Sequence, residues 1–275
     1  MEGVFVMMDF HSHILPYLDD GAKNFDMALN MLRISQEEGV EYVCATPHFI
    51  PGEFELDRKT FDVKLDNLSC LGNYKKIDVK LLPGLEIYIA PELPELYRTK
   101  KIWGLNDSRY LLIELPMQQM PIYTEEVLYE LRLLGVIPII AHPERNSILR
   151  NHRGVLVKLL EQGALAQVNA GSLRGLYGKE IKSFSEYLVK NNMVNFLGSD
   201  GHNDGIRSTS IAYAIESVKK LNFELYQWME FNSLRVIKNL EVNSLGVRKA
   251  KKRLYIIRFW ERESLLQMNN RNCRM

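Results

Sequence analysis

The sequence predicts an α/β protein, a distorted TIM-like barrel of about seven parallel βα units. Short apolar segments alternate with helical patterns along most of the chain, and parallel strands require such helical crossovers. The chain has 275 residues, and barrels of roughly 200 to 250 residues routinely form one domain. Side chains that bind metals follow nearly every predicted strand, which is where barrels place their functional groups.

The predicted strands are short apolar segments at residues 4–10, 41–45, 79–82, 110–113, 137–141, 165–168 and 194–197. Their continuous apolar character is typical of parallel strands covered on both faces. Helical segments lie between them at residues 25–38, 57–71, 92–100, 123–134, 155–162 and 179–191. Asn24 is a suitable N-cap for the first helix, and Gly39 is a suitable stop. Three further helices are predicted at residues 212–220, 224–231 and 233–240.

An open, doubly wound sheet is the alternative, but it would gather ligands at one switch point rather than after six strands. We assign residues 1–247 to the barrel and residues 248–275 to a basic C-terminal tail. Between Arg248 and Arg262 the tail has seven Lys or Arg residues and one Glu. Such a segment can contact an anionic membrane surface. The preferred interpretation is that its apolar residues pack on the barrel or that it is a solvated end.

Composition excludes several classes of protein. The net charge of +1 argues against a general nucleic-acid-binding surface. The three cysteines, Cys44, Cys70 and Cys273, are odd in number and widely spaced, which fits a reducing compartment. We find neither a signal-peptide pattern nor the run of roughly 18 apolar residues that a membrane span needs. We therefore expect a cytoplasmic protein.

The candidate metal ligands are imidazoles and carboxylates at the ends of predicted strands. His11 and His13 are two residues apart, so extended backbone directs both imidazoles to one face. Any one of these residues has an ordinary interpretation as a loop side chain, but that interpretation is poor for the whole set. The set exceeds the four to six donors of a single ion, which indicates about two or three ions. Its members are His11, His13, Asp20, His48, Glu86, Glu114, His142, Asp200 and His202.

Imidazole and carboxylate donors without thiolate suit Zn, Mn or Fe. Arg145 and Arg207 fall on loops that face the same barrel mouth, and guanidinium groups bind phosphate oxygens bidentately. Pairing with Glu144 or Asp204 is the alternative for these arginines. A cluster of divalent ions beside two arginines predicts hydrolysis of a phosphoester, because such ions activate water and stabilise the leaving oxygen.

A covalent cysteine mechanism does not fit the chain. It requires an arginine six positions after the cysteine, but Ile50 stands there after Cys44 and Lys76 after Cys70. Cys44 is instead expected in the core. No Gly-rich loop ending in Lys-Ser or Lys-Thr is present, so nucleotide-driven phosphoryl transfer is unsupported.

The ordered motifs resemble a known family. They are His-Ser-His-Ile-Leu-Pro, Asp-Asp-Gly, Ala-Thr-Pro-His, Leu-Pro-Gly-Leu-Glu-Ile, Leu-Ile-Glu-Leu-Pro, Ile-Ala-His-Pro-Glu-Arg-Asn, Asn-Ala-Gly-Ser-Leu and Gly-Ser-Asp-Gly-His-Asn. Together, over residues 8–240, they resemble the bacterial manganese-dependent protein-tyrosine phosphatases of the polymerase and histidinol phosphatase (PHP) superfamily.

The resemblance implies a three-metal barrel, with Mn as the expected metal. Its substrate would be phosphotyrosine in the C-terminal tail of a membrane-associated tyrosine kinase that controls capsule or exopolysaccharide synthesis. By position, the first ion would be held by His11, His13, Glu86 and Asp200. The second would be held by Glu86, Glu114 and His142, and the third by Asp20, His48 and His202. Arg145 and Arg207 would bind the phosphate group of the substrate.

Some alternatives stay open. Relatives often have a histidine where Asp19 and Asp20 stand, so Asp19 is an alternative third-site ligand. A phosphatase of a small phosphomonoester such as histidinol phosphate is the first rival function. A non-catalytic protein that binds the phosphotyrosine tail is the second, although such a protein has no use for so many metal donors.

Overall fold

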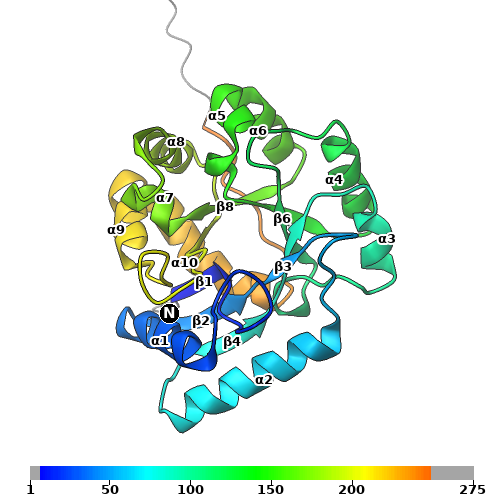
Figure 1. Ribbon diagram of the computed structural model, residues 1–275. Coiled ribbons are helices and arrows are strands. Elements are labelled where there is room, and N and C mark those ends of the chain that lie inside the picture. The colour runs from blue at the N-terminus through cyan, green and yellow to red at the C-terminus, as the bar shows by residue number, and fades with distance from the viewer. Residues whose placement is uncertain (1–6, 249–275) are drawn as a thin grey trace, which may run out of the picture.

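The computed structural model describes residues 7–248, so the predicted tail, apart from Arg248, lies outside the described residues. Strands occupy the centre of the molecule, and helices surround them (Figure 1). Every pair of neighbouring named strands is parallel. The strands are β1 Met7–Ser12, β2 Val40–Ala45, β3 His48–Phe49, β4 Lys80–Pro83, β5 Glu86–Tyr88, β6 Tyr110–Glu114, β7 Ile137–Ala141, β8 Leu165–Asn169 and β9 Phe196–Gly198.

The described strands form two curled sheets with the orders β1-β2-β4 and β3-β5-β6-β7-β8-β9. Two breaks separate these sheets. Thr46 and Pro47 divide β2 from β3, and proline cannot donate to a strand ladder. Gly84 and Leu85 divide β4 from β5. A Cβ on Gly84 would lie 2.9 Å from a Leu105 methyl carbon, so any larger residue there would require the Leu105 side chain to shift.

The sheets close into a barrel between β1 and the segment after β9. Asp200 N donates to His11 O at 2.8 Å, and His13 N donates to Gly201 O at 2.9 Å. If each broken strand is counted once, the described strands occupy seven positions, as the alternation in the sequence predicts. The predicted distorted barrel is confirmed. The distortion lies in the two breaks, between β2 and β3 and between β4 and β5.

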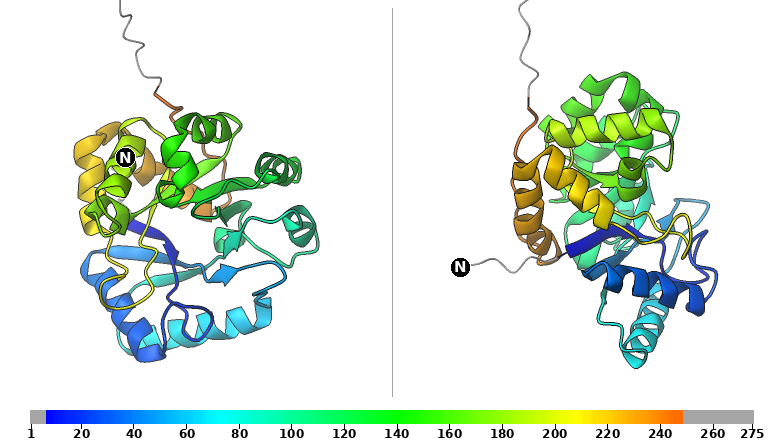
Figure 2. Two further views of the ribbon diagram at one scale, coloured as in Figure 1. Left: turned by 45° about the horizontal axis from the view of Figure 1, so that its top comes forward. Right: turned by 90° about the vertical axis from the view of Figure 1, so that its left-hand side faces the viewer.

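Ten α-helices of the described chain surround the strands (Figure 2). They are α1 Phe25–Glu37, α2 Arg58–Tyr74, α3 Leu93–Arg98, α4 Thr124–Leu133, α5 Ser147–Asn151, α6 Arg153–Glu161, α7 Ala170–Arg174, α8 Lys179–Lys190, α9 Ala212–Leu221 and α10 Phe223–Ile237. The side chain of Asn24 caps α1 by accepting from Met27 N, and Gly39 follows with φ +80°, as expected. No helix within residues 7–248 is both long and apolar enough to cross a bilayer.

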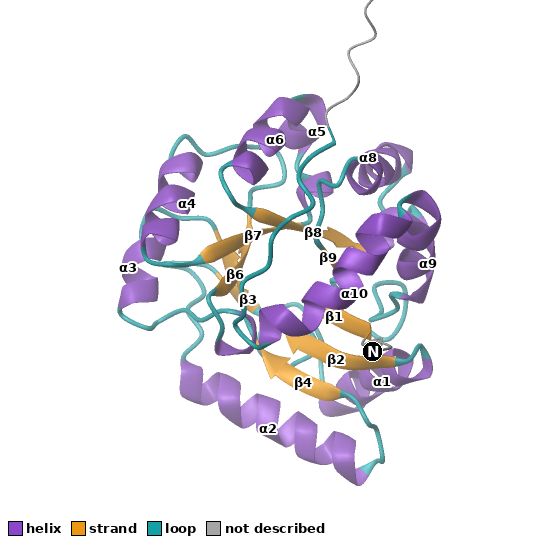
Figure 3. Cartoon of the chain, turned by 180° about the vertical axis from the view of Figure 1, so that it is seen from behind, coloured by secondary structure: helices purple, strands orange, loops and turns teal. Residues whose placement is uncertain are grey.

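The prediction of two helices at residues 224–231 and 233–240 is wrong, because α10 is continuous through Asn232 and Ser233. The Asn232 amide donates to Trp228 O and the Ser233 hydroxyl to Met229 O, each one turn back. These polar side chains therefore bond within the helix rather than ending it. Seen from behind, α10 crosses the barrel opening on that side (Figure 3).

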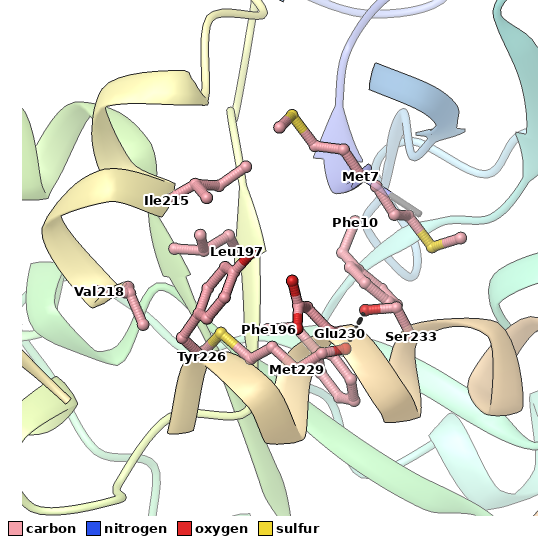
Figure 4. Close-up of a pocket in the computed structure, with 11 residues that line it drawn as sticks. Met7, Phe10, Phe196, Leu197, Ile215, Val218, Tyr226, Met229, Glu230 and Ser233 are labelled. Atoms are coloured by element: carbon pink, nitrogen blue, oxygen red, sulfur yellow. Dashed lines mark hydrogen bonds between the residues drawn. The ribbon is translucent and has the colours of Figure 1, made fainter. Parts of the chain in front are cut away.

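A small apolar cavity of about 40 Å³ lies under α10 (Figure 4). It is lined by side chains such as Met8 and Phe10 near the start of β1 and Phe196 at the start of β9. The amino ends of the strands therefore lie here, and the candidate ligands lie at their carboxyl ends. Its lining is mostly apolar and its volume is small, so we regard it as a packing gap.

Candidate metal centre

His11 and His13 face the barrel interior from β1 and the residue directly after its end. Both side chains are fully buried, and their Nε2 atoms are 3.1 Å apart. Two imidazole nitrogens this close to each other suit a shared cation, as their spacing in the sequence predicts. The first candidate pair is therefore brought together.

Glu86 is the central carboxylate of the site. Its Oε2 lies 3.2 Å from His11 Nε2, and its Oε1 lies 2.7 Å from His142 Nε2. It also approaches His13 Nε2 at 3.1 Å and His48 Nδ1 at 3.0 Å. Burial alone would raise the pKa of Glu86, but the surrounding imidazoles, His11 first, hold it well below its usual range. The expectation that Glu86 ends a strand is wrong, because it begins β5 after the break at Gly84.

Glu114, the last residue of β6, lies at the edge of the same cluster. Its Oε1 is 3.8 Å from His142 Nε2, and its Oε2 is 3.9 Å from His48 Nδ1. Burial raises its pKa, and the neighbouring Glu86 carboxylate raises it further. Two acidic groups this close, in a buried place, favour a cation between them.

Asp20 and Asp19 have different surroundings. Asp20 Oδ1 lies 3.3 Å from His202 Nε2 and 3.6 Å from His48 Nε2, and its side chain is mostly exposed at the mouth. Asp19 Oδ2 lies 2.7 Å from His13 Nδ1 and accepts from His48 N at 3.1 Å. Asp19 therefore holds His13 from the side opposite the cluster, and the described geometry favours Asp20 as the third-site donor.

Two candidate ligands have unusual backbone conformations. His142 has φ +29° and Asp200 has φ +52°, both in the left-handed region that non-glycine residues seldom adopt. Such conformations cost about 1–3 kcal/mol each and occur where the fold must aim a functional side chain. They turn both side chains from strand ends into the cluster.

Asp200 connects the donors to the two arginines. Arg145 Nη1 donates to its Oδ2 at 2.8 Å, and Arg207 Nη2 donates to its Oδ1 at 3.2 Å. Burial would raise the pKa of Asp200, but His11 and His142 lower it to about 2. The ring of Tyr177 lies 4.8 Å from the Arg145 guanidinium, an arrangement typical of a cation–π contact.

The nine predicted donors meet in four overlapping groups whose ligand atoms lie within 4.8 Å of one another. The donor chemistry fits hard or borderline divalent ions. Two buried atoms, Glu86 Oε2 and His48 Nδ1, lie 3.0 Å apart without forming a well-aligned hydrogen bond, an arrangement that a cation bound between them would stabilise. The groups are His13, Asp20, His48 and His202; His11, Glu86 and His142; His11, His13 and Asp200; and His48, Glu86 and Glu114.

The sequence-based assignment of donors to ions differs in detail from these groups. Glu114 lies with His48 as well as with Glu86, and His13 lies with the Asp20 group. His152, the remaining histidine, lies outside these groups and is exposed on the surface. The sequence reasoning missed Gln167 and Asn169 on β8, since neutral amides in an apolar strand resemble ordinary strand residues.

The fold and the site define a class of protein: a parallel α/β barrel with a cluster of metal donors at the carboxyl ends of its strands. The model of the capsular polysaccharide synthesis family CpsB/CapC matches residues 7–233. The chain belongs to that CpsB/CapC family, which confirms the resemblance inferred from the motifs.

Curated relatives agree with this assignment. CapC of Staphylococcus aureus is 40% identical over 196 residues, which cover 71% of this chain and 77% of CapC. Tyrosine-protein phosphatase YwqE of Bacillus subtilis is 37% identical over 214 residues, or 78% of this chain and 84% of YwqE. Tyrosine-protein phosphatase CpsB of Streptococcus agalactiae is 29% identical over 220 residues, which cover 77% of this chain and 89% of CpsB.

Solved structures show the same fold. One comes from work on YwqE from Bacillus subtilis and CpsB from Streptococcus pneumoniae, described as unique metal-dependent tyrosine phosphatases. It matches with a TM-score of 0.85 and 35% identity, covering 90% of this chain and 100% of that chain. Histidinol phosphate phosphatase from Lactococcus lactis matches with a TM-score of 0.50 and 16% identity, covering 79% and 94%. That likeness concerns the fold alone.

Proposed function

We propose that this protein is a metal-dependent tyrosine-protein phosphatase that hydrolyses phosphotyrosine in a protein. The observation that carries the proposal is the convergence of imidazole and carboxylate donors with two arginines at one barrel mouth. Membership of the CpsB/CapC family supports it. So do the names of the relatives YwqE and CpsB, which are tyrosine-protein phosphatases.

The proposed ligands are the nine donors described above, binding two or three divalent ions. Glu86 lies in two of the four groups, and its two carboxylate oxygens approach different imidazoles, so it would serve as a bridging ligand. His11, His13 and His48 are also shared between groups. Mn is the proposed metal, on the strength of the motif resemblance, and the donor set also suits Fe and Zn.

The bound ions would supply an activated water and neutralise charge on the phosphate. Arg145 and Arg207 bind the phosphate oxygens in this mechanism, because their guanidinium groups converge beside the donors. Asp200 orients both guanidinium groups by accepting one hydrogen bond from each. A phenol leaving group, with a pKa of about 10, departs with less protonation than an alkoxide requires.

The proposed substrate is a phosphorylated protein tail, which needs an accessible mouth. Asp20 at the mouth is mostly exposed. Tyr17 and Ile206, on the two loops that carry Asp20 and Arg207, are 62% and 74% exposed. These apolar side chains offer contacts to residues that flank a phosphotyrosine.

The resemblance and the family description further suggest a partner. We propose the tyrosine-rich tail of a membrane-associated tyrosine kinase in capsule or exopolysaccharide synthesis, met in the cytoplasm. A weak membrane-surface contact through the basic residues 248–275 belongs to the same proposal, and that segment lies outside the described residues apart from Arg248.

The decisive experiment compares a phosphotyrosine peptide with histidinol phosphate as substrates of metal-stripped protein, with and without added Mn²⁺. We expect the peptide to be hydrolysed faster, chelators to abolish turnover, and Cys44→Ser to retain it. Faster hydrolysis of histidinol phosphate would favour the small-molecule alternative. Binding of the peptide without turnover under any metal would favour the non-catalytic alternative.

A further inference from the structure

β8 contributes no candidate metal ligand, yet two of its polar side chains point into the site. Gln167 and Asn169 are both fully buried. An uncharged amide in a barrel interior is costly unless its donors and acceptors are used. Their hydrogen bonds lead directly to two of the proposed ligands.

The amides form a continuous chain between His11 and Asp200. His11 Nδ1 lies 3.0 Å from Gln167 Oε1. Gln167 Nε2 donates to Asn169 Oδ1 at 2.9 Å, and Asn169 Nδ2 donates to Asp200 Oδ2 at 2.7 Å. Three hydrogen bonds thus join ligands that are far apart in the sequence.

The Asp200 carboxylate determines which group donates and which accepts in each of these three hydrogen bonds. The Asp200 carboxylate accepts from the guanidinium groups of Arg145 and Arg207, so it is the acceptor for Asn169 as well. Asn169 must therefore present its NH₂ group to Asp200 and its carbonyl oxygen to Gln167. Gln167 must then present its NH₂ group to Asn169 and its carbonyl oxygen to His11.

This direction determines which nitrogen of His11 carries the proton. A carbonyl oxygen only accepts, so His11 Nδ1 must be protonated to donate to Gln167. In the neutral imidazole that a metal ion requires, the Nε2 atom then keeps its lone pair, and it is the atom that faces Glu86 at 3.2 Å and His13 Nε2 at 3.1 Å. Metal-binding histidines are commonly oriented by such a bond from the other ring nitrogen.

The neighbourhood holds the amides in place. Glu144 Oε1 accepts from Asn169 N at 2.8 Å, which anchors the end of β8. A Cβ on Gly198 would lie 2.5 Å from His11 Cβ and 2.7 Å from Gln167 Nε2. Glycine at this position therefore leaves room for the bond between His11 and Gln167.

We propose that Gln167 and Asn169 are positioning residues that set the tautomer of His11 and aim the Asp200 carboxylate for metal binding. The inference rests on the proposed metal centre but not on the identity of the substrate. Among the described strand positions of the barrel, β8 is the one without a candidate ligand. We infer that its amides instead orient the ligands on β1 and after β9.

The first test changes the amides and measures metal binding without substrate. Gln167→Met keeps similar volume but removes the acceptor for His11. We expect the dissociation constant for Mn²⁺, measured by calorimetry on metal-stripped protein, to rise about 10- to 100-fold. Asn169→Leu should act in the same direction. Gln162→Met, an exposed change after α6, is the matched control and should leave Mn²⁺ binding unchanged.

The second test needs no variant, so it remains decisive if Gln167→Met does not fold. In wild-type protein loaded with Zn²⁺, nitrogen NMR of labelled histidine should show His11 protonated at Nδ1 and metal-bound at Nε2. Binding through Nδ1 would overturn the proposal, as would Mn²⁺ affinity in folded Gln167→Met equal to that of Gln162→Met. Failure to hydrolyse phosphotyrosine would overturn the proposed function and leave both measurements interpretable.

Discussion

Arg145 Nη1 donates to Asp200 Oδ2 at 2.8 Å, so a proposed phosphate-binding cation contacts a proposed metal ligand. Arg207 approaches the other oxygen of the same carboxylate from a different loop. The positions of the two guanidinium groups are therefore linked through one buried acidic side chain. Substrate binding and metal binding share this contact.

The two arginines can be tested by charge-conserving changes. In Arg145→Lys and Arg207→Lys the positive charge remains, but the planar group that binds two oxygens is lost. We expect kcat/KM for a phosphotyrosine peptide to fall by about 10²–10³, as for loss of one preorganised donor. Arg98→Lys, on the exposed end of α3, is the control. Steady-state kinetics equal to those of the control would contradict a phosphate-binding role.

Metal removal should lower stability as well as activity. A bound metal ion would add a cationic partner for the buried Glu86 and the neighbouring carboxylates, so a chelator should lower the thermal midpoint. Metal at a hundredfold excess over its Kd stabilises the native state by about 2.7 kcal/mol. Calorimetric scans with and without chelator measure the difference.

The size of that shift should depend on the ligand removed. Glu86→Gln should abolish most of the chelator-dependent shift, because the bridging carboxylate is fully buried among imidazoles. Asp20→Asn should retain more of the shift, since Asp20 is mostly exposed and near two histidines only at the rim. Equal loss in both variants would argue against a central role for Glu86.

Glu38 is predicted to hold the loop that carries Arg207. Its carboxylate accepts from Ser210 Oγ at 2.5 Å, Ile211 N at 2.7 Å and Ala212 N at 2.8 Å, at the start of α9. Glu38→Ala removes this cap and should cost about 0.5–2 kcal/mol of unfolding free energy.

The same change should raise KM, because the loop before α9 is less restrained. Glu37→Ala, the exposed neighbour at the end of α1, is the matched control. Urea unfolding and steady-state kinetics measure both effects. Unchanged stability in Glu38→Ala would show that the cap contributes nothing beyond what water supplies.

Cys44 should be inert toward thiol reagents. It is fully buried, and burial raises the pKa of its thiol far above the ordinary value. Because the folded-state pKa is raised, the native protein keeps this proton as pH rises. Above the ordinary thiol pKa of about 8.5, the Cys44 thiol loses its proton in the unfolded chain but keeps it in the folded protein. This difference lowers the free energy of unfolding as the pH rises.

Alkylation at pH 9 followed by peptide mass spectrometry checks this prediction. We expect the exposed Cys70 to be labelled and Cys44 to be protected in the folded protein. Activity should persist after labelling, in contrast to its loss on chelation. Rapid modification of Cys44 together with inactivation would reopen a thiol mechanism.

Much of the fold and of the site could be predicted from local patterns. Apolar segments of strand length alternate with amphipathic helices, and this alternation requires parallel strands. Parallel strands in a barrel end at one face, so ligands that follow different strands must meet there. The nine candidate donors and both candidate phosphate-binding arginines could be named in this way, and the structure brings the nine donors together. The family could also be inferred, because its motifs are contiguous and ordered.

Only the tertiary structure decided which groups touch. Asp19 and Asp20 are adjacent and chemically alike, and their separate roles depend on how the loop after β1 folds against His13 and His202. Glu86 became central because the strand breaks at Gly84, which no periodicity predicts. The helix α10 continues through Asn232 because its side chain finds a carbonyl one turn back.

The amides of β8 illustrate the physical reason for this division. A hydrophobic period or a histidine at a strand end is a local property, and it can be read from neighbouring residues. The hydrogen bond between His11 and Gln167 joins residues 156 positions apart, and its existence depends on barrel closure and strand register. The sequence by itself determined which functional groups are present at the barrel mouth. The closed barrel decided which of their atoms contact one another.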